Sequence, residues 1–334
     1  MSPSPYETYV EQIMEIGAIH IPYEMNAKFS PWGDLRLLFF YWRTYRQLKP
    51  NYVVHYTIKP NIYGSLAARA NKVPSLAVVP GTGSVFQNSG MVSLMVGQLY
   101  KWAFRYPQKV WVLNGDDYRA FLMKNIVNQD RLAILPGEGV DTSFFCYKEY
   151  KRHSPFIFLY MGRMLREKGV EFMAKAVKLL HQKGIDDFEV RLLGLVDGLS
   201  KDVISEEEIR QWEKEGLVRF LGSTSDVRPY IEEADCILLP TFYGEGVPRS
   251  LMEACSMGRM VLTTDNVGCR DVVQDSYNGI LCKPKDVEDL GVKMEMILSM
   301  SEQTIRNMGE NGRKKMMVEF AEAKIVKRYL EEIS

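Results

Sequence analysis

The segment FIFLYMGRMLREKGVEFMAKAVKLLH, Phe156–His181, decides the fold class. It opens with an apolar, β-prone run, Phe156–Met161, which Gly162 then breaks. From Val170 to His181 the apolar residues recur at the three- and four-residue spacing of a helix. A short strand, a glycine turn and an amphipathic helix are the repeating parts of a β-α-β unit. The segment therefore predicts a parallel sheet with helices packed on it.

The same alternation continues on both sides of this segment. The chain has 334 residues, more than one hydrophobic core usually serves. The polar, aperiodic stretch Cys146–Ser154 interrupts the alternation, and we interpret it as a linker. We predict an α/β protein of two Rossmann-like domains with parallel sheets, residues 1–149 and residues 150–318. The other predicted strands are Tyr52–Tyr56, Ser75–Val79, Val110–Leu113, Leu132–Leu135, Phe188–Leu193, Val218–Leu221, Cys236–Leu239 and Met260–Thr263, and the other predicted helices are Tyr63–Ala70, Asp116–Asn125, Arg249–Ser256 and Glu319–Ile333.

Composition excludes several classes of protein. Lys plus Arg and Asp plus Glu number 42 each, so the chain as a whole has no net attraction to nucleic acid. The five cysteines are odd in number and form no C-x-x-C pair, which is typical of reduced cysteines in the cytosol. No apolar run approaches the ~20 residues that span a bilayer, and the N-terminus does not resemble a secretory signal. We expect a cytoplasmic protein without a nucleic-acid partner.

The turn after Phe156–Met161 is the first of three candidate ligand-binding strand ends. In open parallel sheets, ligands bind beyond the carboxyl ends of the strands. Gly162 frees the backbone there, and Arg163 and Lys168 place two cations where a diphosphate would lie. The alternative is ordinary solvated charge at a turn.

The second strand end is LLPTFYGEGVPRSLMEA, Leu238–Ala254. Glu245 lies between two glycines, ahead of a helix whose N-terminus would accept phosphate. Glu245 would therefore meet a sugar, and Glu253 would meet a ribose. For Glu253 the alternative is a capping box formed with Ser250.

The third strand end is the loop Gly222–Asp226, whose hydroxyl and backbone groups would meet a nucleobase. Ser225 or Asp226 is also a good helix cap, which is the structural alternative. The sequence has no Asp-x-Asp pair near a strand end, so we expect neither a metal ion nor a cofactor beside the nucleotide co-substrate.

Together these segments resemble the family-4 retaining glycosyltransferases of the GT-B fold. The resemblance rests on GRMLREKGV, LGSTSDV, GEGVPRSLMEA with its Glu-x7-Glu pair, and NVGCRDVVQDSYNGILCKP. It implies a metal-free reaction that retains the anomeric configuration, and a C-terminal helix that crosses back to the first domain. It also implies catalytic roles for Arg163, Lys168 and Glu245. The donor site that it implies consists of Gly162, Arg163, Lys168, Gly222, Ser223, Thr224, Glu245, Gly246, Val247 and Glu253.

Motifs in the first half of the chain indicate a narrower group within this family. VVHYTIKPNIYGSLAARANKVP, GTGSVF and LPGEGVD are similar to bacterial members that extend polyprenyl-diphosphate-linked oligosaccharides, mostly from UDP-sugars, for capsule, exopolysaccharide or protein glycosylation. The implied reaction is transfer from a nucleotide diphosphate sugar to a hydroxyl of a lipid-linked saccharide. The acceptor-side residues would be His55, Lys59, Gly81 and Gly83. A lone histidine such as His55 is more often structural.

Several features depart from the family pattern. The chain starts where relatives have their second helix, so we expect the usual first strand and glycine-rich loop to be missing. No histidine follows Ala77–Val79, Glu138 replaces a small residue, and Asp271 replaces a common glutamate. Two alternatives follow: a catalytically impaired or non-catalytic partner subunit, and a sugar-nucleotide epimerase on the same fold.

Two segments mix aromatic and basic side chains, Leu35–Lys49 and Leu99–Trp111. Such a mixture suits contact with the cytoplasmic face of the inner membrane, with rings at headgroup level and cations on anionic lipid. The alternative is an amphipathic helix that packs on a domain core.

Overall fold

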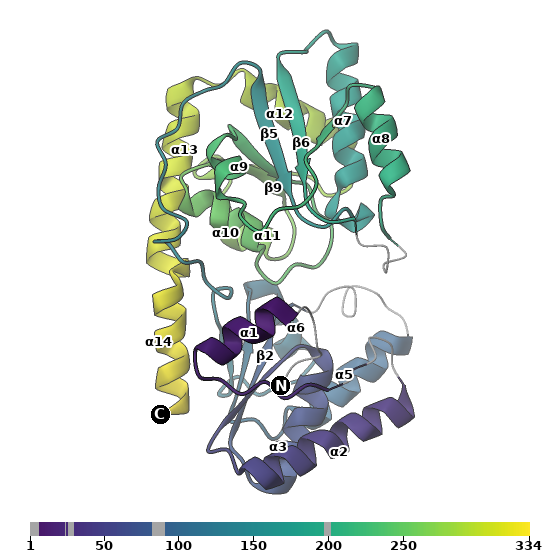
Figure 1. The fold of residues 1–334 in the computed structure, drawn as a ribbon, viewed down its shortest axis with the longest axis vertical. Helices are drawn as coiled ribbons and strands as arrows, with labels where there is room; N and C mark the ends of the chain where they lie inside the picture. The colour runs from purple at the N-terminus through teal and green to yellow at the C-terminus, as the bar shows by residue number, and fades with distance from the viewer. Residues whose placement is uncertain (1–6, 24, 26–29, 82–90, 197–201) are drawn as a thin grey trace. The chain divides into compact units, whose positions relative to one another are not determined.

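A computed structural model describes residues 7–23, 25, 30–81, 91–196 and 202–334 (Figure 1). The chain divides into two compact units. The first unit is Met1–Val78 with Leu99–Val110, and the second unit is Val79–Gln98 with Trp111–Ser334. The domain boundary near residue 150 stays a prediction.

The first unit contains a parallel strand pair and the helices packed around it. Strands β1 and β2 run parallel, with Val53 opposite Ser75. Helix α2 begins after Ser30, whose hydroxyl accepts a hydrogen bond from the Gly33 amide at 3.4 Å. A buried cluster of Tyr23, Leu37, Tyr41, Tyr45, Ala67 and Ala68 forms the core. The elements are α1 (Glu7–Glu15), α2 (Pro31–Leu48), β1 (Val53–Tyr56), the π-helix η1 (Pro60–Gly64), α3 (Ser65–Asn71) and β2 (Ser75–Val79).

Four elements follow in the chain before the second sheet: α5 (Met91–Ala103), β3 (Lys109–Val112), α6 (Gly115–Met123) and β4 (Leu132–Ile134). Helix α6 is capped by Asn114, whose side-chain oxygen accepts from the Asp117 amide at 2.8 Å. Residues 146–155 form no helix or strand. They are nevertheless anchored, because the Arg259 guanidinium donates to the Lys148 carbonyl at 2.7 Å.

The second unit contains a six-stranded sheet in the order β10-β9-β8-β5-β6-β7, and the strand pairings are parallel. From β5 the chain winds outward through β6 to β7, then returns to β8 and winds the other way. The strand order therefore reverses between β5 and β8, where open α/β sheets bind ligands. The strands are β5 (Phe156–Met161), β6 (Phe188–Leu193), β7 (Arg219–Phe220), β8 (Cys236–Leu239), β9 (Met260–Thr264) and β10 (Gly279–Cys282).

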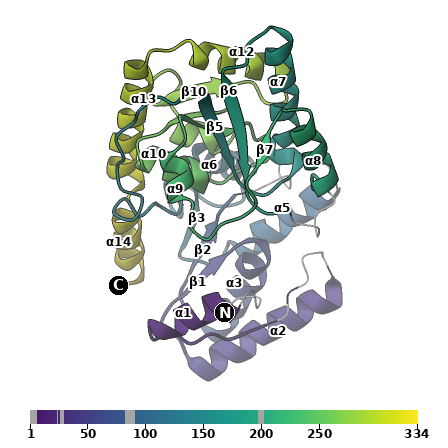
Figure 2. The same cartoon turned by 45° about the horizontal axis from the view of Figure 1, so that its top comes forward.

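Helices cover both faces of this sheet. Helices α7 and α8 lie on one side of β5 and β6, and α10 and α13 lie on the other (Figure 2). The helices are η2 (Arg166–Lys168, 3-10), α7 (Val170–Gln182), α8 (Glu206–Lys214), α9 (Arg228–Glu232), α10 (Arg249–Ser256), α11 (Cys269–Val272), α12 (Val287–Leu298), α13 (Glu302–Lys315), η3 (Met316–Phe320, π) and α14 (Glu322–Ile333).

The C-terminal helix packs through only part of its predicted apolar face: Ile325 is buried, whereas Val326, Leu330 and Ile333 are exposed. Ala321 forms a β-bridge with Val140, and the Tyr329 ring lies 4.9 Å from the ring of Trp111. The chain thus returns at its end to an earlier segment of the sequence. Among the described residues, no helix is both long and apolar enough to cross a membrane.

Candidate active site

A cavity of about 350 Å³ opens beyond the carboxyl ends of β5 and β8. It lies in the second unit, where the strand order reverses. Six residues that the sequence predicts for the donor site line it: Gly162, Arg163, Lys168, Glu245, Gly246 and Val247. The structure thus brings the first two predicted strand ends together around one space.

The central feature of the cavity is an ion pair between Lys168 Nζ and Glu245 Oε1. The Lys168 and Glu245 side chains are only 16% and 11% exposed. Glu245 Oε1 also accepts from the Thr241 hydroxyl at 3.2 Å, and the Lys168 ammonium lies 5.4 Å from the centre of the Tyr243 ring. Partial burial strengthens such an interaction compared with one in bulk water. An anion and a sugar hydroxyl entering the cavity would each find a charged partner already held in place.

Hydrogen bonds fix the loop that carries Glu245. The backbone amides of Phe242 and Tyr243 donate to the Glu167 carbonyl at 2.9 and 3.1 Å. The Asn266 side-chain amide donates to the Tyr243 carbonyl at 2.8 Å. These contacts tie the loop to the turn that carries Lys168, so the two charges are positioned together.

Asn114 holds the next residue of the same loop. Its side chain is fully buried, and its amide nitrogen donates to the Gly246 carbonyl at 3.0 Å and to Asp117 at 2.9 Å. Asn114 is not among the site residues that the sequence predicts. A polar residue after a predicted strand and just before a predicted helix is a helix-cap signal, but its partner Gly246 lies 132 positions away.

Gly246 is required by a close backbone approach. A Cβ atom at this position would lie 1.5 Å from the Pro80 carbonyl oxygen. The following helix, α10, has Pro248 as its N-cap residue, and no side chain caps it. The unsatisfied amides of a helix N-terminus, with its positive dipole end, favour an anion at this end of the cavity.

A buried tyrosine holds the backbone at Arg163 in place. The Tyr160 hydroxyl donates to the Arg163 carbonyl at 2.6 Å. Burial, and then the negative charge of Glu245, raise the pKa of Tyr160, so the hydroxyl stays a donor. Arg163 itself is among the residues that line the cavity.

Glu253 lies on α10, four positions after the first helical residue, and does not line the cavity. Its Oε1 atom lies 3.7 Å from Arg249 Nε, and burial raises the pKa of its carboxyl group. The capping-box alternative is wrong, because α10 begins at Arg249 and has no side-chain cap. Its ribose-binding role stays a prediction.

The loop Gly222–Asp226 lies beside the first strand end without lining the cavity. The Gly194 amide donates to the Gly222 carbonyl at 2.7 Å, and a Cβ on Gly194 would lie 1.8 Å from the Gly162 carbonyl oxygen. Ser223 and Thr224 are exposed. Asp226 accepts two hydrogen bonds from the Arg228 guanidinium, at 2.8 and 2.7 Å. Asp226 Oδ1 also accepts from the backbone amide of Arg228, the first residue of α9, at 3.0 Å. This contact supports the helix-cap alternative for Asp226, although the N-cap residue itself, Val227, has no side-chain hydrogen bond.

The predicted acceptor-side residues lie in different surroundings. His55 is buried in the first unit, with the Tyr45 hydroxyl 2.9 Å from Nε2 and the Ser65 hydroxyl 3.4 Å from Nδ1. Burial lowers the pKa of His55 to about 3, so its ring is neutral. This placement favours the structural alternative. Lys59 forms an ion pair with Asp34 at 2.6 Å.

Gly81 lies beside Gly246, where an added Cβ would be 2.9 Å from the Gly246 nitrogen. Gly83 lies outside the described residues. The structure also shows where the two residues that depart from the family pattern lie. Glu138 is exposed and lines the cavity, and Asp271 accepts from the Gly115 amide at 3.3 Å. In the described part of the chain, no group of three or more His, Cys, Asp or Glu side chains is placed to hold a metal ion.

The family model for glycosyl transferases group 1 matches residues 147–315, which include both strand ends and the ion pair. The chain belongs to this family. It is therefore a glycosyltransferase, and its two-unit α/β architecture is the GT-B fold.

Curated relatives align along most of this glycosyltransferase. An N,N'-diacetylbacillosaminyl-diphospho-undecaprenol alpha-1,3-N-acetylgalactosaminyltransferase from Campylobacter jejuni is 26% identical, over 98% of this chain and 88% of the relative. A UDP-Gal:alpha-D-GlcNAc-diphosphoundecaprenol alpha-1,3-galactosyltransferase from Escherichia coli is 24% identical, over 84% of this chain and 76% of the relative.

Solved structures support the fold. A glycosyltransferase from Rickettsia africae has a TM-score of 0.79 at 18% identity and covers 98% of this chain and 87% of its own. Anabaena HepE in complex with UDP has a TM-score of 0.77 at 18% identity, covering 98% of this chain and 88% of its own.

Proposed function

We propose that this glycosyltransferase moves a sugar from a nucleotide diphosphate sugar, with UDP as the nucleotide, to a hydroxyl of a lipid-diphosphate-linked saccharide. The reaction retains the anomeric configuration and serves the synthesis of surface polysaccharide or another glycan. The observation that carries the proposal is the Lys168–Glu245 ion pair beside Arg163 in the cavity at the sheet's switch point. The names of both curated relatives, which contain diphospho-undecaprenol, and the UDP complex of HepE support it.

The chemistry follows from the charges that line the cavity. When the bond between the anomeric carbon and the diphosphate oxygen breaks, negative charge develops on the departing nucleotide. Arg163 and Lys168 stabilise that charge, and the backbone N–H groups around Gly246 and Val247 add to it. A new bond forms between the acceptor oxygen and the anomeric carbon on the same face of the sugar, and the proton of the acceptor hydroxyl passes to the departing diphosphate oxygen. Glu245 orients the sugar ring for this step.

We assign the remaining donor contacts to two flanking elements. Glu253 accepts the ribose hydroxyls, and Gly222, Ser223 and Thr224 meet the base. Fixed cations take the place of a metal ion, so no cofactor beyond the donor is needed. Treatment with EDTA is therefore expected to leave the rate unchanged, whereas an activity that returns only with added Mg²⁺ or Mn²⁺ would contradict this assignment.

The test is a transfer assay with purified protein. A panel of UDP-sugars is incubated with an N-acetylhexosamine linked through diphosphate to a prenyl chain, and UDP release and the product's anomeric configuration are measured. Acceptor-dependent UDP release with a retained α-linkage supports the proposal. Absence of release across the panel favours a non-catalytic partner subunit, and conversion of the sugar while it stays on UDP favours an epimerase. An inverted linkage would contradict retention.

We also propose that the enzyme works in the cytoplasm, in peripheral contact with the inner membrane. Residues 30–78 and 99–110 contain ten Lys or Arg side chains and a single acid, Asp34, although the whole chain carries no net charge. Asp34 is paired with Lys59. On the same unit Trp32 is 79% exposed, Phe39 58% and Trp102 48%. Exposed aromatic rings together with excess cations favour an anionic lipid surface.

Vesicle sedimentation tests the membrane contact. We expect the protein to sediment with vesicles of phosphatidylglycerol and phosphatidylethanolamine at low salt and to be released by high salt. Equal sedimentation with purely zwitterionic vesicles would show that the cations do not contribute.

A further inference from the structure

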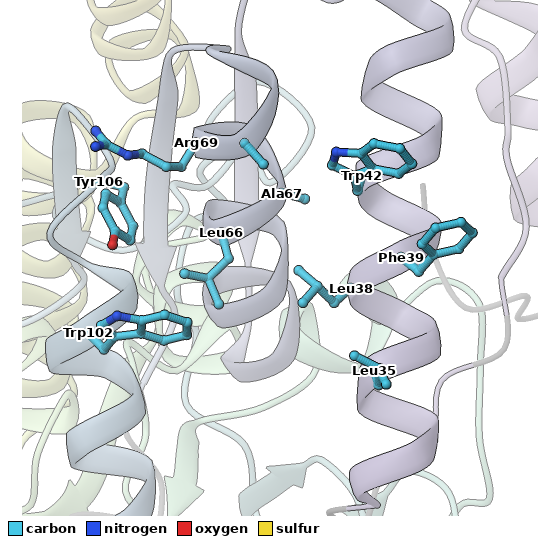
Figure 3. A pocket seen from close by; sticks show the side chains of 10 residues that line it. Leu35, Leu38, Phe39, Trp42, Leu66, Ala67, Arg69, Trp102 and Tyr106 are labelled. Atoms are coloured by element: carbon cyan, nitrogen blue, oxygen red, sulfur yellow. The ribbon is translucent and has the colours of Figure 1, made fainter.

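The first unit contains an apolar groove that the proposed reaction does not use. Its volume is about 420 Å³, within the usual range of small-molecule sites. Leu38, Phe39 and Trp42 of α2 form one wall, and Trp102 and Tyr106 form the other. Figure 3 shows Leu66 of α3 between the two walls, with Leu38 directed toward it.

The groove is hollow in part because two of the four residues that α3 presents to it are alanines. Ala67 and Ala70 line it at positions one turn apart on α3, between the larger residues of the two walls. Leucine or phenylalanine at either position would fill the space between the walls. The hollow is therefore a property of the sequence of α3 and not of an open surface.

We propose that this groove binds an isoprenoid segment of the acceptor's lipid chain. The inference rests on the proposed function, since it takes the lipid to be a polyprenyl diphosphate. An isoprenoid chain has no hydrogen-bonding groups, so an apolar trough satisfies it completely, and removing it from water is favourable in proportion to the buried area.

The charged groups at the groove also match this ligand. Arg69 is the one charged side chain among the lining residues, and its guanidinium lies 4.7 Å from the centre of the Tyr106 ring. Arg46 lies in the same way 5.3 Å from the ring of Trp42. Each guanidinium is thus held beside an aromatic wall residue by a cation–π contact. A lipid with an apolar chain and a diphosphate head meets complementary groups at both of its ends.

Net charge favours an anionic lipid over an apolar peptide helix. The segments that build the groove, residues 30–78 and 99–110, carry nine more positive than negative side chains. An apolar protein partner would gain nothing from this excess, and a second copy of this chain would be repelled by it. A prenyl diphosphate would bind through both its apolar chain and its negatively charged head.

A photo-crosslinking experiment with the full chain tests the groove without any transfer reaction. The probe is farnesyl diphosphate with a diazirine on its chain, and the comparison probe is a diazirine fatty acid of equal carbon number. Labelled peptides are identified by mass spectrometry. We expect labelling by the prenyl probe in Pro31–Leu48, Ser65–Asn71 or residues 99–106, unaffected by excess UDP.

The variant is Ala70→Phe, and its matched control is Gln47→Phe. Both residues are exposed in the first unit, but only Ala70 is among the described groove residues. Both variants introduce an exposed phenyl ring, so a general affinity for lipid would rise or stay the same in both. If the groove holds the chain, Ala70→Phe lowers labelling by about tenfold, the effect of losing one or two buried methylene contacts, while Gln47→Phe leaves it unchanged.

Three other outcomes overturn the proposal. Equal labelling by the fatty-acid probe would make the groove a general lipid contact, and labelling elsewhere would remove the groove from lipid binding. Labelling between two chains, together with a doubled mass in ultracentrifugation, would assign the groove to a second copy. If groove labelling persists while the transfer assay shows no acceptor-dependent UDP release, the proposed reaction fails and the groove assignment stands.

Discussion

The cavity of the second unit and the groove of the first unit are built on opposite principles. The cavity contains an ion pair of Lys168 with Glu245, and its loop is fixed by part-buried hydrogen bonds. The groove has apolar walls, and two alanines of α3 lie between them. The first arrangement suits a reaction in which charge develops at a defined point, and the second suits a flexible chain without directional contacts.

This difference also determines how each region responds to mutation. A charged site depends on individual atoms, so removing one side chain removes a specific interaction. An apolar groove depends on shape, so filling it matters more than removing any one wall. Replacing a single charged residue of the cavity is therefore expected to have the largest effect on the rate of transfer.

Lys168→Ala and Glu245→Ala are expected to lower kcat/KM by about 10²–10³, because each removes a charge that acts where the diphosphate leaves or the sugar is oriented. Steady-state kinetics of UDP release measures the change. Lys175→Ala is the matched control, since Lys175 forms an exposed ion pair with Glu171 on α7. Rates near wild type in Lys168→Ala and Glu245→Ala would refute the roles given to this ion pair.

Asn114→Ala is expected to lower kcat by about tenfold and the free energy of unfolding by about 1–3 kcal/mol, since it leaves the part-buried Gly246 carbonyl without this donor. The change in kcat should exceed the change in KM for the donor, because the loop is displaced but its charges remain. Asn307→Ala, at an exposed position on α13, is the control. A loss of stability with unchanged kcat would make Asn114 structural and not a positioning residue.

The strands and the turn residues could be predicted because their signals are local. The bounds of β5, β6 and β8 match the expected ranges. β5 and β8 are continuous apolar runs, and β6 alternates apolar residues with Glu189 and Arg191 before it ends in two leucines. Arg163 and Lys168 follow one strand, and Glu245 follows another. Because the carboxyl ends of parallel strands meet at one edge, their convergence in one cavity could be predicted too.

The contacts that hold these residues could not be predicted in the same way. Asn114 and Gly246 are far apart in the sequence, and no spacing rule links them. The groove likewise joins Leu35 to Tyr106, and its depth depends on Ala67 and Ala70, which look like ordinary helix formers in the sequence. Strand-end position alone also gave His55 a place at the acceptor cleft, whereas burial beside Tyr45 makes it part of the first unit's core.

His55 should make the stability of the first unit sensitive to acid. Its folded pKa, lowered to about 3, lies below the unfolded value near 6.5. Between these values the unfolded chain binds the proton, so stability falls as the pH decreases below about 6.5. From pH 7.5 to 5.5 we expect His55 to account for a loss of about 1 kcal/mol. Urea unfolding of the wild type and of His55→Gln at both pH values measures it, and parallel pH dependence in the two proteins would contradict it.

Glu253→Gln should have the smallest effect on stability. It also distinguishes the cost of burying the Glu253 carboxylate from a role of this carboxylate in donor binding. Burial raises the folded pKa of Glu253, so its charged form costs stability at neutral pH, and the cost disappears as the pH falls through the folded pKa. The variant should therefore be more stable than the wild type at pH 7.5, by less than about 1 kcal/mol, and the gain should shrink in acid. Glu319→Gln, at an exposed position, should show neither change. If Glu253 accepts the ribose hydroxyls, the same variant binds UDP more weakly, so stability and affinity move in opposite directions. A variant that gains stability and keeps full affinity for UDP in calorimetry would leave Glu253 as a buried carboxylate on α10 without a role in donor binding.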